Sequence, residues 1–154
     1  MTEASWYDNF IKRMSMSRKK AEVSDIIRAV IEKDQEVLFA YLYGSSAYAD
    51  LPGADIDLAL YLKIEDIKPC VKKEEELTAI LATKLHTDKI DLRILNVSPF
   101  LLQYNVLKEG VLIFSRDEAE RVDFETRVMD RFFELKPYLD EYNRMLLLRI
   151  EEGI

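Results

Sequence analysis

The chain has 154 residues, 49% of them hydrophobic, a length and composition typical of one compact domain that closes its own core. Its formal net charge of −7 argues against a broad nucleic-acid surface, because neutralising phosphates requires clustered Lys and Arg. We interpret the one short basic run, Arg18-Lys19-Lys20, as a solvated helix end or turn. We therefore expect a single domain that makes no direct contact with nucleic acid.

The sequence predicts neither a membrane span nor a secretory leader. No apolar run approaches the roughly 20 residues that a bilayer crossing needs, and the first thirty residues are too charged and interrupted for a secretory signal. Cys70 is the single cysteine, so an internal disulfide or a zinc site built on paired thiols cannot form. We expect a cytoplasmic protein without a membrane partner.

The predicted elements alternate between helices and strands, beginning with a helical region over residues 5–33. This region opens at Ser5 as an N-cap, breaks near residues 15–17, and starts again with Ser24 as a second N-cap. Residues 37–43 then predict a strand. Because this strand is apolar on both faces, we expect other parts of the fold to cover both sides of it.

Two further strands carry acidic residues on one face. Residues 55–62 predict a strand in which apolar side chains recur with period two, while Asp55 and Asp57 occupy the other face. Residues 90–95 repeat this pattern, with Asp91 projecting opposite the apolar face. The sequence therefore predicts three carboxylates on two strands.

One helix is predicted between those two strands and another after them. The first helix spans residues 70–86. Ser98 followed by Pro99 predicts the start of the second helix, a cap and then a first-turn proline, and Gly110 is placed to end it as a left-handed C-cap. Residues 111–114 predict a short final strand.

From residue 117 to the end the pattern is helical, with a kink or split expected at Pro137, which has no N–H to donate. One apolar stripe has the three- and four-residue spacing of a helix face. Its members are Val128, Phe132, Leu135, Leu139, Tyr142, Leu146 and Ile150. Other apolar residues lie off this stripe: Met129, Phe133, Met145 and Leu148. The segment therefore carries more apolar surface than a helix packed on one side needs.

The turn after the strand over residues 37–43 is the first candidate site. Gly44 lets the backbone turn tightly, and a helix that begins at Ser45 would present N–H groups and a hydroxyl to a phosphate. Ser46 follows in the same turn. We therefore take Gly44, Ser45 and Ser46 as candidate residues for binding the phosphates of a nucleotide.

Asp55, Asp57 and Asp91 are candidate metal ligands and catalytic residues. Asp55 and Asp57 lie two apart on a strand and so point the same way, where they can share a hard cation that prefers oxygen ligands, and Asp91 can complete the site. Converging carboxylates repel one another unless cations or a proton neutralise them. Magnesium together with a triphosphate resolves that conflict. The arrangement implies nucleotidyl transfer, with Asp91 accepting the proton of the attacking hydroxyl.

Four other polar residues receive weaker interpretations. His86 follows a helical stretch, and we interpret it as a C-terminal cap rather than a catalyst. Arg93 shares a face with Asp91, where it either contacts a phosphate or forms a structural ion pair. Tyr41 and Tyr43 alternate on a strand and are interpreted as core or pocket wall.

The order Gly44-Ser45, Asp55-Ile56-Asp57 and a later strand acid, Asp91, resembles the DNA polymerase β-like nucleotidyltransferase superfamily, specifically the minimal nucleotidyltransferases. The resemblance implies an α/β (α+β) fold with a mixed central sheet flanked by helices. It also implies that Gly44 and Ser45 grip the triphosphate of ATP, that Asp55 and Asp57 bind Mg²⁺, and that Asp91 is the third ligand and the base.

The C-terminal part resembles one branch of this superfamily. Residues 114–117 (Phe-Ser-Arg-Asp), residues 123–125 (Asp-Phe-Glu) and the long terminal helix are similar to antitoxins that pair with HEPN-domain ribonuclease toxins. Such antitoxins transfer AMP from ATP to a tyrosine of the toxin. The resemblance implies a nucleotidyltransferase core over residues 1–116, a helical extension over residues 117–154 that binds the partner, and a hetero-oligomer.

The sequence departs from the family pattern in the loop between the first two strands. The family usually reads Gly-Ser-x-Ala-Arg-Gly, whereas Tyr48 and Ala49 stand in place of the arginine and second glycine, and Asp50 still matches. Ala54 replaces the serine before the first metal-binding Asp, and the loop is one residue shorter than the common spacing. These changes bear on the grip on the phosphates and hence on turnover.

Two other functions remain open beside protein adenylylation. The fold can act as a catalytically weak or inactive binding module that neutralises the partner by occlusion with its long helix. A third possibility is a transferase acting on a small hydroxyl compound such as an antibiotic. We rank this last, because the sequence shows no second domain that would enclose such a substrate.

Overall fold

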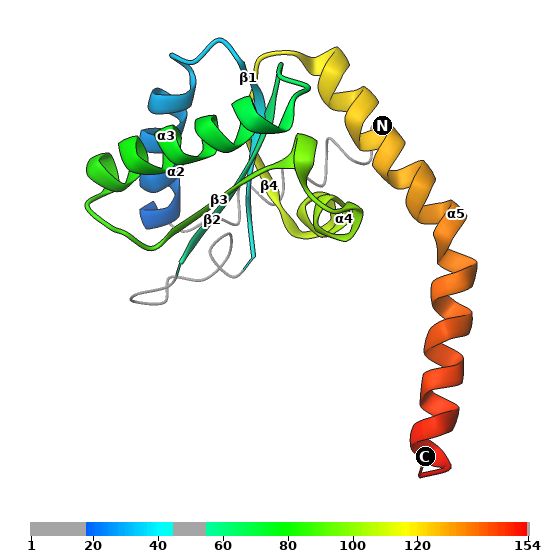
Figure 1. The fold of residues 1–154 in the computed structure, drawn as a ribbon. Coiled ribbons are helices and arrows are strands. Elements are labelled where there is room, and N and C mark those ends of the chain that lie inside the picture. The colour runs from blue at the N-terminus through cyan, green and yellow to red at the C-terminus, as the bar shows by residue number, and fades with distance from the viewer. Residues whose placement is uncertain (1–17, 45–54, 154) are drawn as a thin grey trace.

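The computed structural model describes residues 18–44 and 55–153. In chain order the elements are α2 (Arg18–Ile31), β1 (Val37–Tyr43), β2 (Ile56–Leu62), α3 (Ile67–Leu85), β3 (Ile90–Ile94), the 3-10 turn η2 (Leu95–Val97), α4 (Phe100–Glu109), β4 (Val111–Ser115) and α5 (Glu118–Glu151). In Figure 1, α2 and α3 lie on one side of the sheet, α4 lies on the other, and α5 extends away from the body. The predicted mixed sheet, flanking helices and long C-terminal helix are confirmed.

The four strands form one mixed sheet in the order β3-β2-β1-β4. β1 pairs antiparallel with β2 and with β4, while β2 pairs parallel with β3. The two central strands are therefore β1 and β2. All seven residues of β1 except Tyr43 are buried, which confirms the prediction that both of its faces are covered.

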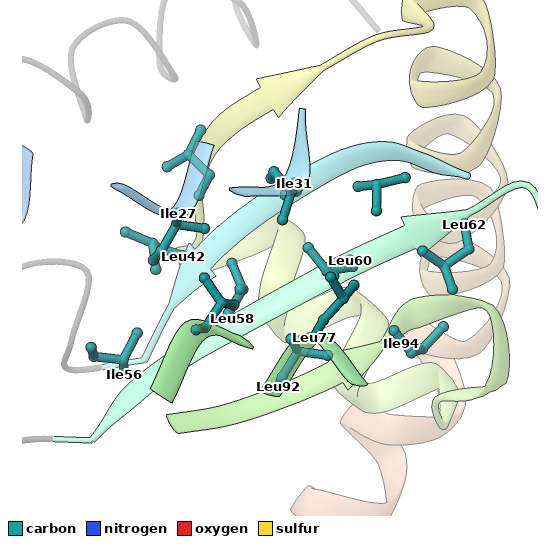
Figure 2. Close-up of a cluster of buried hydrophobic side chains, with 14 of the residues drawn as sticks. Ile27, Ile31, Leu42, Ile56, Leu58, Leu60, Leu62, Leu77, Leu92 and Ile94 are labelled. Atoms are coloured by element: carbon teal, nitrogen blue, oxygen red, sulfur yellow. The ribbon is translucent and has the colours of Figure 1, made fainter. Parts of the chain in front are cut away.

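One core layer lies between the sheet and the pair α2 and α3. It gathers the side chains of β2 and β3 that alternate toward this face, such as Leu58, Leu60 and Leu92, together with Ile27 from α2 and Leu81 from α3. Figure 2 shows these strand side chains in one cluster with Ile27, Ile31 and Leu77. Burial of these alternate side chains in this layer fixes the register of β2 and β3.

A second core layer lies between the opposite face of the sheet and the pair α4 and α5. Phe39 of β1 stacks on Tyr61 of β2 with ring centroids 4.6 Å apart, and both rings pack against Phe124 of α5. Phe132, two turns further along α5, stacks on Tyr104 of α4 at 4.0 Å. Aromatic contacts thus dock the first half of α5 onto the body.

A buried polar network fixes α5 to the central strand. The hydroxyl of Tyr41 on β1 donates a hydrogen bond to Glu125, and Arg121 Nη1 donates to the same carboxylate at 3.0 Å. Arg121 also pairs with Glu118 one turn earlier. Burial together with the Glu125 carboxylate raises the pKa of Tyr41 well above its ordinary value. Tyr41 therefore stays a donor, and the charges of Arg121 and Glu125 offset each other.

α5 is continuous through Pro137, and its direction changes near the middle of the helix, as expected of a proline that removes one backbone hydrogen bond (Figure 1). Its N-terminus is capped by Asp117, whose side chain accepts from the N–H of Glu120. The stripe is buried at Val128, but Leu139 and the residues that follow it up to Gly153 are exposed. Within the described ranges, no helix combines the length and apolarity that a bilayer crossing needs.

Two of the predicted helix starts are wrong. Ser24 lies inside α2 with its side chain in the core, because the helix already includes Arg18 and has no break there. Ser98 does not cap α4, since its hydroxyl donates to the carbonyl of Ile94 at 2.7 Å and Pro99 takes the N-cap position. The predicted cap at Ser5 and the break at residues 15–17 lie outside the described residues.

The left-handed helix end was predicted at the wrong residue. Gly110 has an extended backbone with φ −75°, so no left-handed conformation requires glycine there. A Cβ at this position would instead collide with the carbonyl oxygen of Val106, because the chain passes close to the end of α4. His86 is the residue that ends its helix in the left-handed region, with φ 53°, which confirms its interpretation as a C-cap.

We predict that the polar network contributes more to folding stability through Glu125 than through Tyr41. Glu125→Ala removes the buried partner of Arg121 and leaves it only the exposed Glu118, so it should lower the free energy of unfolding by about 3–5 kcal/mol. Tyr41→Phe removes one hydrogen bond but leaves the ion pair, and should cost about 1–3 kcal/mol. Urea denaturation measures both values. Equal losses for the two variants would contradict the prediction.

Candidate functional site

The candidate site lies where three strand ends meet. Asp57 on β2 and Asp91 on β3 are direct register partners in the parallel pair, so their side chains lie on the same face of the sheet. Tyr43, the last residue of β1, is paired with Asp57 from the other side. Asp55 is exposed and directly precedes β2. The structure therefore places Asp57 and Asp91 side by side on the sheet face that points away from α2 and α3, at the end where these strands begin. We call this end of that face the open face.

Gly44 follows β1 at this edge of the site and turns the backbone directly against Asp57. Its φ of +66° lies in the left-handed region, which an L side chain rarely adopts. A Cβ on Gly44 would also collide with the Oδ2 atom of Asp57. Both observations require glycine, because the backbone turns away from β1 directly against a carboxylate. The predicted residues Ser45 and Ser46 lie outside the described residues, as do Tyr48, Ala49, Asp50 and Ala54.

Negative charge is concentrated around Asp57. Burial, then the neighbouring charges of Asp91 and Asp55, raise the pKa of Asp57 above its ordinary value. Burial, followed by the charges of Asp91 and Asp57, raises the pKa of Tyr43 to about 12. The Tyr43 hydroxyl is therefore protonated at neutral pH. The folded chain holds these carboxylates together against their mutual repulsion.

Two cations oppose this charge. Arg93 follows Asp91 on the same face of β3, and its Nε lies 2.9 Å from Asp91 Oδ1. Of the two interpretations of Arg93, the structure shows the ion pair. Lys20 of α2 is only 9% exposed, and its charge lowers the pKa of Asp57 against the other influences. The site thus contains a basic residue near each of the two paired carboxylates.

The sequence analysis missed Lys20 as part of the site. The basic run of residues 18–20 was predicted to be solvated. Arg18 and Lys19 are exposed, but Lys20 is buried, so the prediction is wrong for Lys20. The signal was the helical spacing, because Lys20, Ser24, Ile27 and Ile31 recur every three or four residues and together form the buried face of α2. Lys20 lies in the first turn of α2, but on the buried face of the helix, so it is not solvated.

The structure forms a carboxylate pair rather than a compact trio. Within residues 18–44 and 55–153, no three His, Cys, Asp or Glu side chains converge as a group that could hold a metal ion. Asp55 acts on Asp57 through its charge but lies before the strand. The roles of Asp55, Asp57 and Asp91 as metal ligands stay a prediction.

The sequence of residues 25–119 matches the family described as "Polymerase beta, Nucleotidyltransferase". The match covers more than half of the chain, so the chain belongs to this nucleotidyltransferase family, as its motifs predicted. The matched segment runs from α2 to the start of α5 and includes Gly44, Asp57, Asp91 and the strands that carry them. None of the curated proteins matches the chain significantly.

Several solved structures share the fold. A toxin–antitoxin complex of MntA and HepT matches with a TM-score of 0.62 and 17% identity over 82% of this chain and 98% of that chain. A toxin–antitoxin structure with AMP-PNP gives 0.66 and 18% over 80% and 98%. A tri-AMPylated HEPN toxin of Shewanella oneidensis in complex with an MNT antitoxin gives 0.62 and 18% over 83% and 98%. At such identities these matches show the fold, and the predicted polymerase β-like fold is confirmed.

We predict that Asp57→Asn stabilises the chain when no metal is bound. The raised pKa of Asp57 means that folding disfavours its ionised form, so removing the charge at neutral pH removes repulsion from Asp91. Because half-exposed charges interact weakly, we expect Tm to rise by about 1–2 °C. The gain should vanish as the pH falls below about 4, where a carboxyl is neutral in both states.

Differential scanning calorimetry in the presence of a chelator tests this prediction. Asp130→Asn is the matched control, because Asp130 is an exposed carboxylate on α5, far from the site. It should leave Tm unchanged within error. A lower Tm for Asp57→Asn at neutral pH would show that Asp57 stabilises the fold and would contradict the prediction.

Proposed function

We propose that this chain is an antitoxin of the nucleotidyltransferase type that transfers AMP from ATP to a tyrosine of a HEPN-domain toxin. The observation that carries this proposal is the in-register pair of Asp57 and Asp91 beside the Gly44 turn, in a member of a nucleotidyltransferase family. The partner is inferred from structures of the same fold that hold toxin–antitoxin complexes, one with AMP-PNP and one with a tri-AMPylated toxin. The reducing cytoplasm suits its lone free Cys70.

Two carboxylates of the site form a partial ligand set for a divalent cation. Asp57 and Asp91 offer oxygen ligands from adjacent strands, and Asp55 can join them from the segment before β2. Their repulsion, visible in the raised pKa of Asp57, is what a cation would relieve. Bound there, Mg²⁺ would screen the triphosphate and stabilise the pyrophosphate that leaves. We propose all three as ligands.

The remaining chemistry falls to the chain's own groups. The Gly44 turn, followed by Ser45 and Ser46, would bind the phosphates through backbone N–H groups and hydroxyls. The tyrosine oxygen of the toxin attacks the α-phosphorus, the bond from this phosphorus to the β-phosphate oxygen breaks, and pyrophosphate leaves. Asp91 accepts the phenolic proton, because its side chain lies on the open face beside Asp57.

The last half of α5 provides a surface for the partner. The stripe that packs on the body at Val128 and Phe132 continues through Leu139, Tyr142 and Leu146, which are exposed. A helix that leaves the body with its apolar stripe uncovered is typical of a helix that binds another protein. We propose that the extension over residues 117–154 binds the toxin in a hetero-oligomer.

Occlusion without catalysis is the second candidate function. The absence of a three-carboxylate cluster within the described residues favours it, as do Tyr48 and Ala49 in the altered loop. Under this account the uncovered stripe of α5 neutralises the toxin by binding alone. The two functions differ in whether Asp57 is needed.

We predict that the chain labels a purified HEPN toxin from ATP carrying ³²P at the α-phosphate, in the presence of Mg²⁺. Asp57→Asn should reduce the rate at least about 100-fold, because it removes a metal ligand and one charge. Asp130→Asn should label at the wild-type rate. If the wild type gives no label while Asp57→Asn still neutralises the toxin in cells, occlusion is the function.

We predict that Leu146→Glu weakens binding to the toxin at least about tenfold, because it places a charge in the uncovered stripe. Leu148→Glu is a matched control. The two leucines are similarly exposed, at 43% and 40%, but Leu148 lies off the stripe on the other side of α5. Titration calorimetry measures both affinities, and circular dichroism checks that α5 stays helical. Equal effects of the two substitutions would exclude the stripe as the interface.

A further inference from the structure

A pocket lies between α4, α5 and the end of β2, apart from the candidate site. Its volume is about 490 Å³, within the usual range of ligand pockets. Because β2 runs from Ile56 to Leu62, Asp57 lies near one end of the strand, and Tyr61, which lines the pocket, lies near the other. The proposed transfer of AMP therefore gives this pocket no role.

Most polar side chains that line the pocket already have partners within the fold. Asn96 exchanges hydrogen bonds with the backbone after β2, and the amide nitrogen of Gln103 donates to a backbone carbonyl at 2.8 Å. Arg127 forms an ion pair with Asp123 at 3.1 Å, one turn earlier on α5. These groups build the walls of the pocket and leave few donors for a ligand.

Arg131 is the exception among these side chains. Its guanidinium carbon lies 4.8 Å from the ring centroid of Phe100, and within the described ranges it forms no ion pair or hydrogen bond. A guanidinium that lies over a ring keeps its N–H groups free at its edge, because they lie in its own plane. Glu65 is the one carboxylate that lines the pocket, and it is exposed. Arg131 is therefore ready to bind an acid that approaches from outside.

Arg131 also belongs to a basic border of the apolar stripe on α5. At about 100° of rotation per residue, the charged residues that flank the stripe are all basic. They are Arg127, Arg131, Lys136 and Arg149. The acidic residues of residues 127–151 fall on the opposite side of the helix: Asp130, Glu134, Asp140, Glu141 and Glu151. The chain has a net charge of −7, so this border is opposite in sign to the chain as a whole.

The pocket and the stripe form one continuous surface. Val128 is a member of the stripe and also lines the pocket, as does Arg131. From there the stripe continues along α5 through Leu139 and Leu146, which are exposed. A helix or strand laid along the stripe therefore meets Arg131 at the point where the stripe reaches the body.

We infer that the stripe, its basic border and the pocket together bind an acidic and apolar segment of the toxin, with an Asp or Glu of that segment paired to Arg131. The inference rests on the proposed function, which supplies the toxin as the partner. Apolar side chains of the segment cover the stripe, and a carboxylate accepts two parallel hydrogen bonds from the planar guanidinium. Nucleic acid is a poorer occupant, because phosphates do not cover apolar side chains and a chain of charge −7 repels a polyanion.

Charge substitutions at Arg131 test the pairing, with surface plasmon resonance on a purified HEPN toxin at low and high salt. Arg131→Gln should weaken binding about two- to fivefold, and Arg131→Glu about ten- to twentyfold, because reversal adds repulsion. The loss should lie mainly in the association rate and shrink as salt rises. Arg144→Glu is the matched control, because Arg144 lies on the opposite side of α5, and should change the affinity less than about twofold.

Glu65→Gln should have the opposite effect. It removes the carboxylate that would repel an acid entering the pocket, so binding should tighten about twofold. Asp130→Asn removes the same charge from the opposite side of α5 and should leave the affinity unchanged. In a charge exchange, one toxin variant with a single Asp or Glu changed to Lys should restore binding to Arg131→Glu.

Equal effects of Arg131→Glu and Arg144→Glu would overturn the inference, as would failure of every toxin variant to restore binding. It is also overturned if Arg131 is needed for binding single-stranded RNA, or vesicles of phosphatidylcholine and phosphatidylserine, but not for binding the toxin. Circular dichroism checks that each variant stays helical. If the wild type does not bind the toxin, the proposed function itself fails. If Arg131→Glu binds and labels the toxin like the wild type, the proposed function stands and only this inference fails.

Discussion

The parallel pairing of β2 with β3 is the constraint on which the site depends. It places Asp57 opposite Asp91, two groups that would separate in an unfolded chain because their charges repel. The hydrophobic face of the same strands enforces this register, since Leu58, Leu60 and Leu92 must all reach the core between the sheet and α2 and α3. A slip by one residue would turn either the leucines outward or an aspartate inward. Packing energy thus holds the carboxylates together.

The side chains of β2 and β3 that stabilise the fold and those that form the site lie on opposite faces of the sheet. One face of β2 and β3 is closed by the aliphatic core, and the other remains open at the end that carries Asp57 and Asp91. Repulsion at the open end is reduced by Lys20 and Arg93, one on a helix and one on the edge strand. A carboxyl whose pKa is raised by burial and neighbouring charges, as that of Asp57 is, is typical of functional sites.

The network of Tyr41, Arg121 and Glu125 has the corresponding role for α5. It joins the central strand to the second turn of the helix and so fixes the direction in which the helix leaves the body. A buried ion pair adds little net stability over apolar packing, but it demands specific partners. From Lys136 to Gly153 every residue of the chain is exposed. The first part of the apolar stripe packs on the body, whereas the later part of the same stripe has no part of the described chain packed against it.

The sequence by itself determined the elements and the candidate residues, because these depend on local spacing. Period-two alternation marked β2 and β3 and placed Asp57 and Asp91 on their polar faces, and helical spacing marked α5. The strand pattern cannot say which strand lies beside which. Only the tertiary structure decided the order β3-β2-β1-β4 and the pairing of the two acids.

The same distinction explains the errors at single residues. Ser98 and Gly110 are residue types that often cap helices. The hydroxyl of Ser98 instead donates to the carbonyl of Ile94 at the end of β3, and Gly110 is needed because a Cβ there would collide with the carbonyl oxygen of Val106. The contact of Tyr41 with Glu125 joins residues 84 positions apart, and no local pattern contains it. The local sequence therefore determines which secondary structure each segment can form. Long-range packing determines which side chains are buried and which charged groups form pairs.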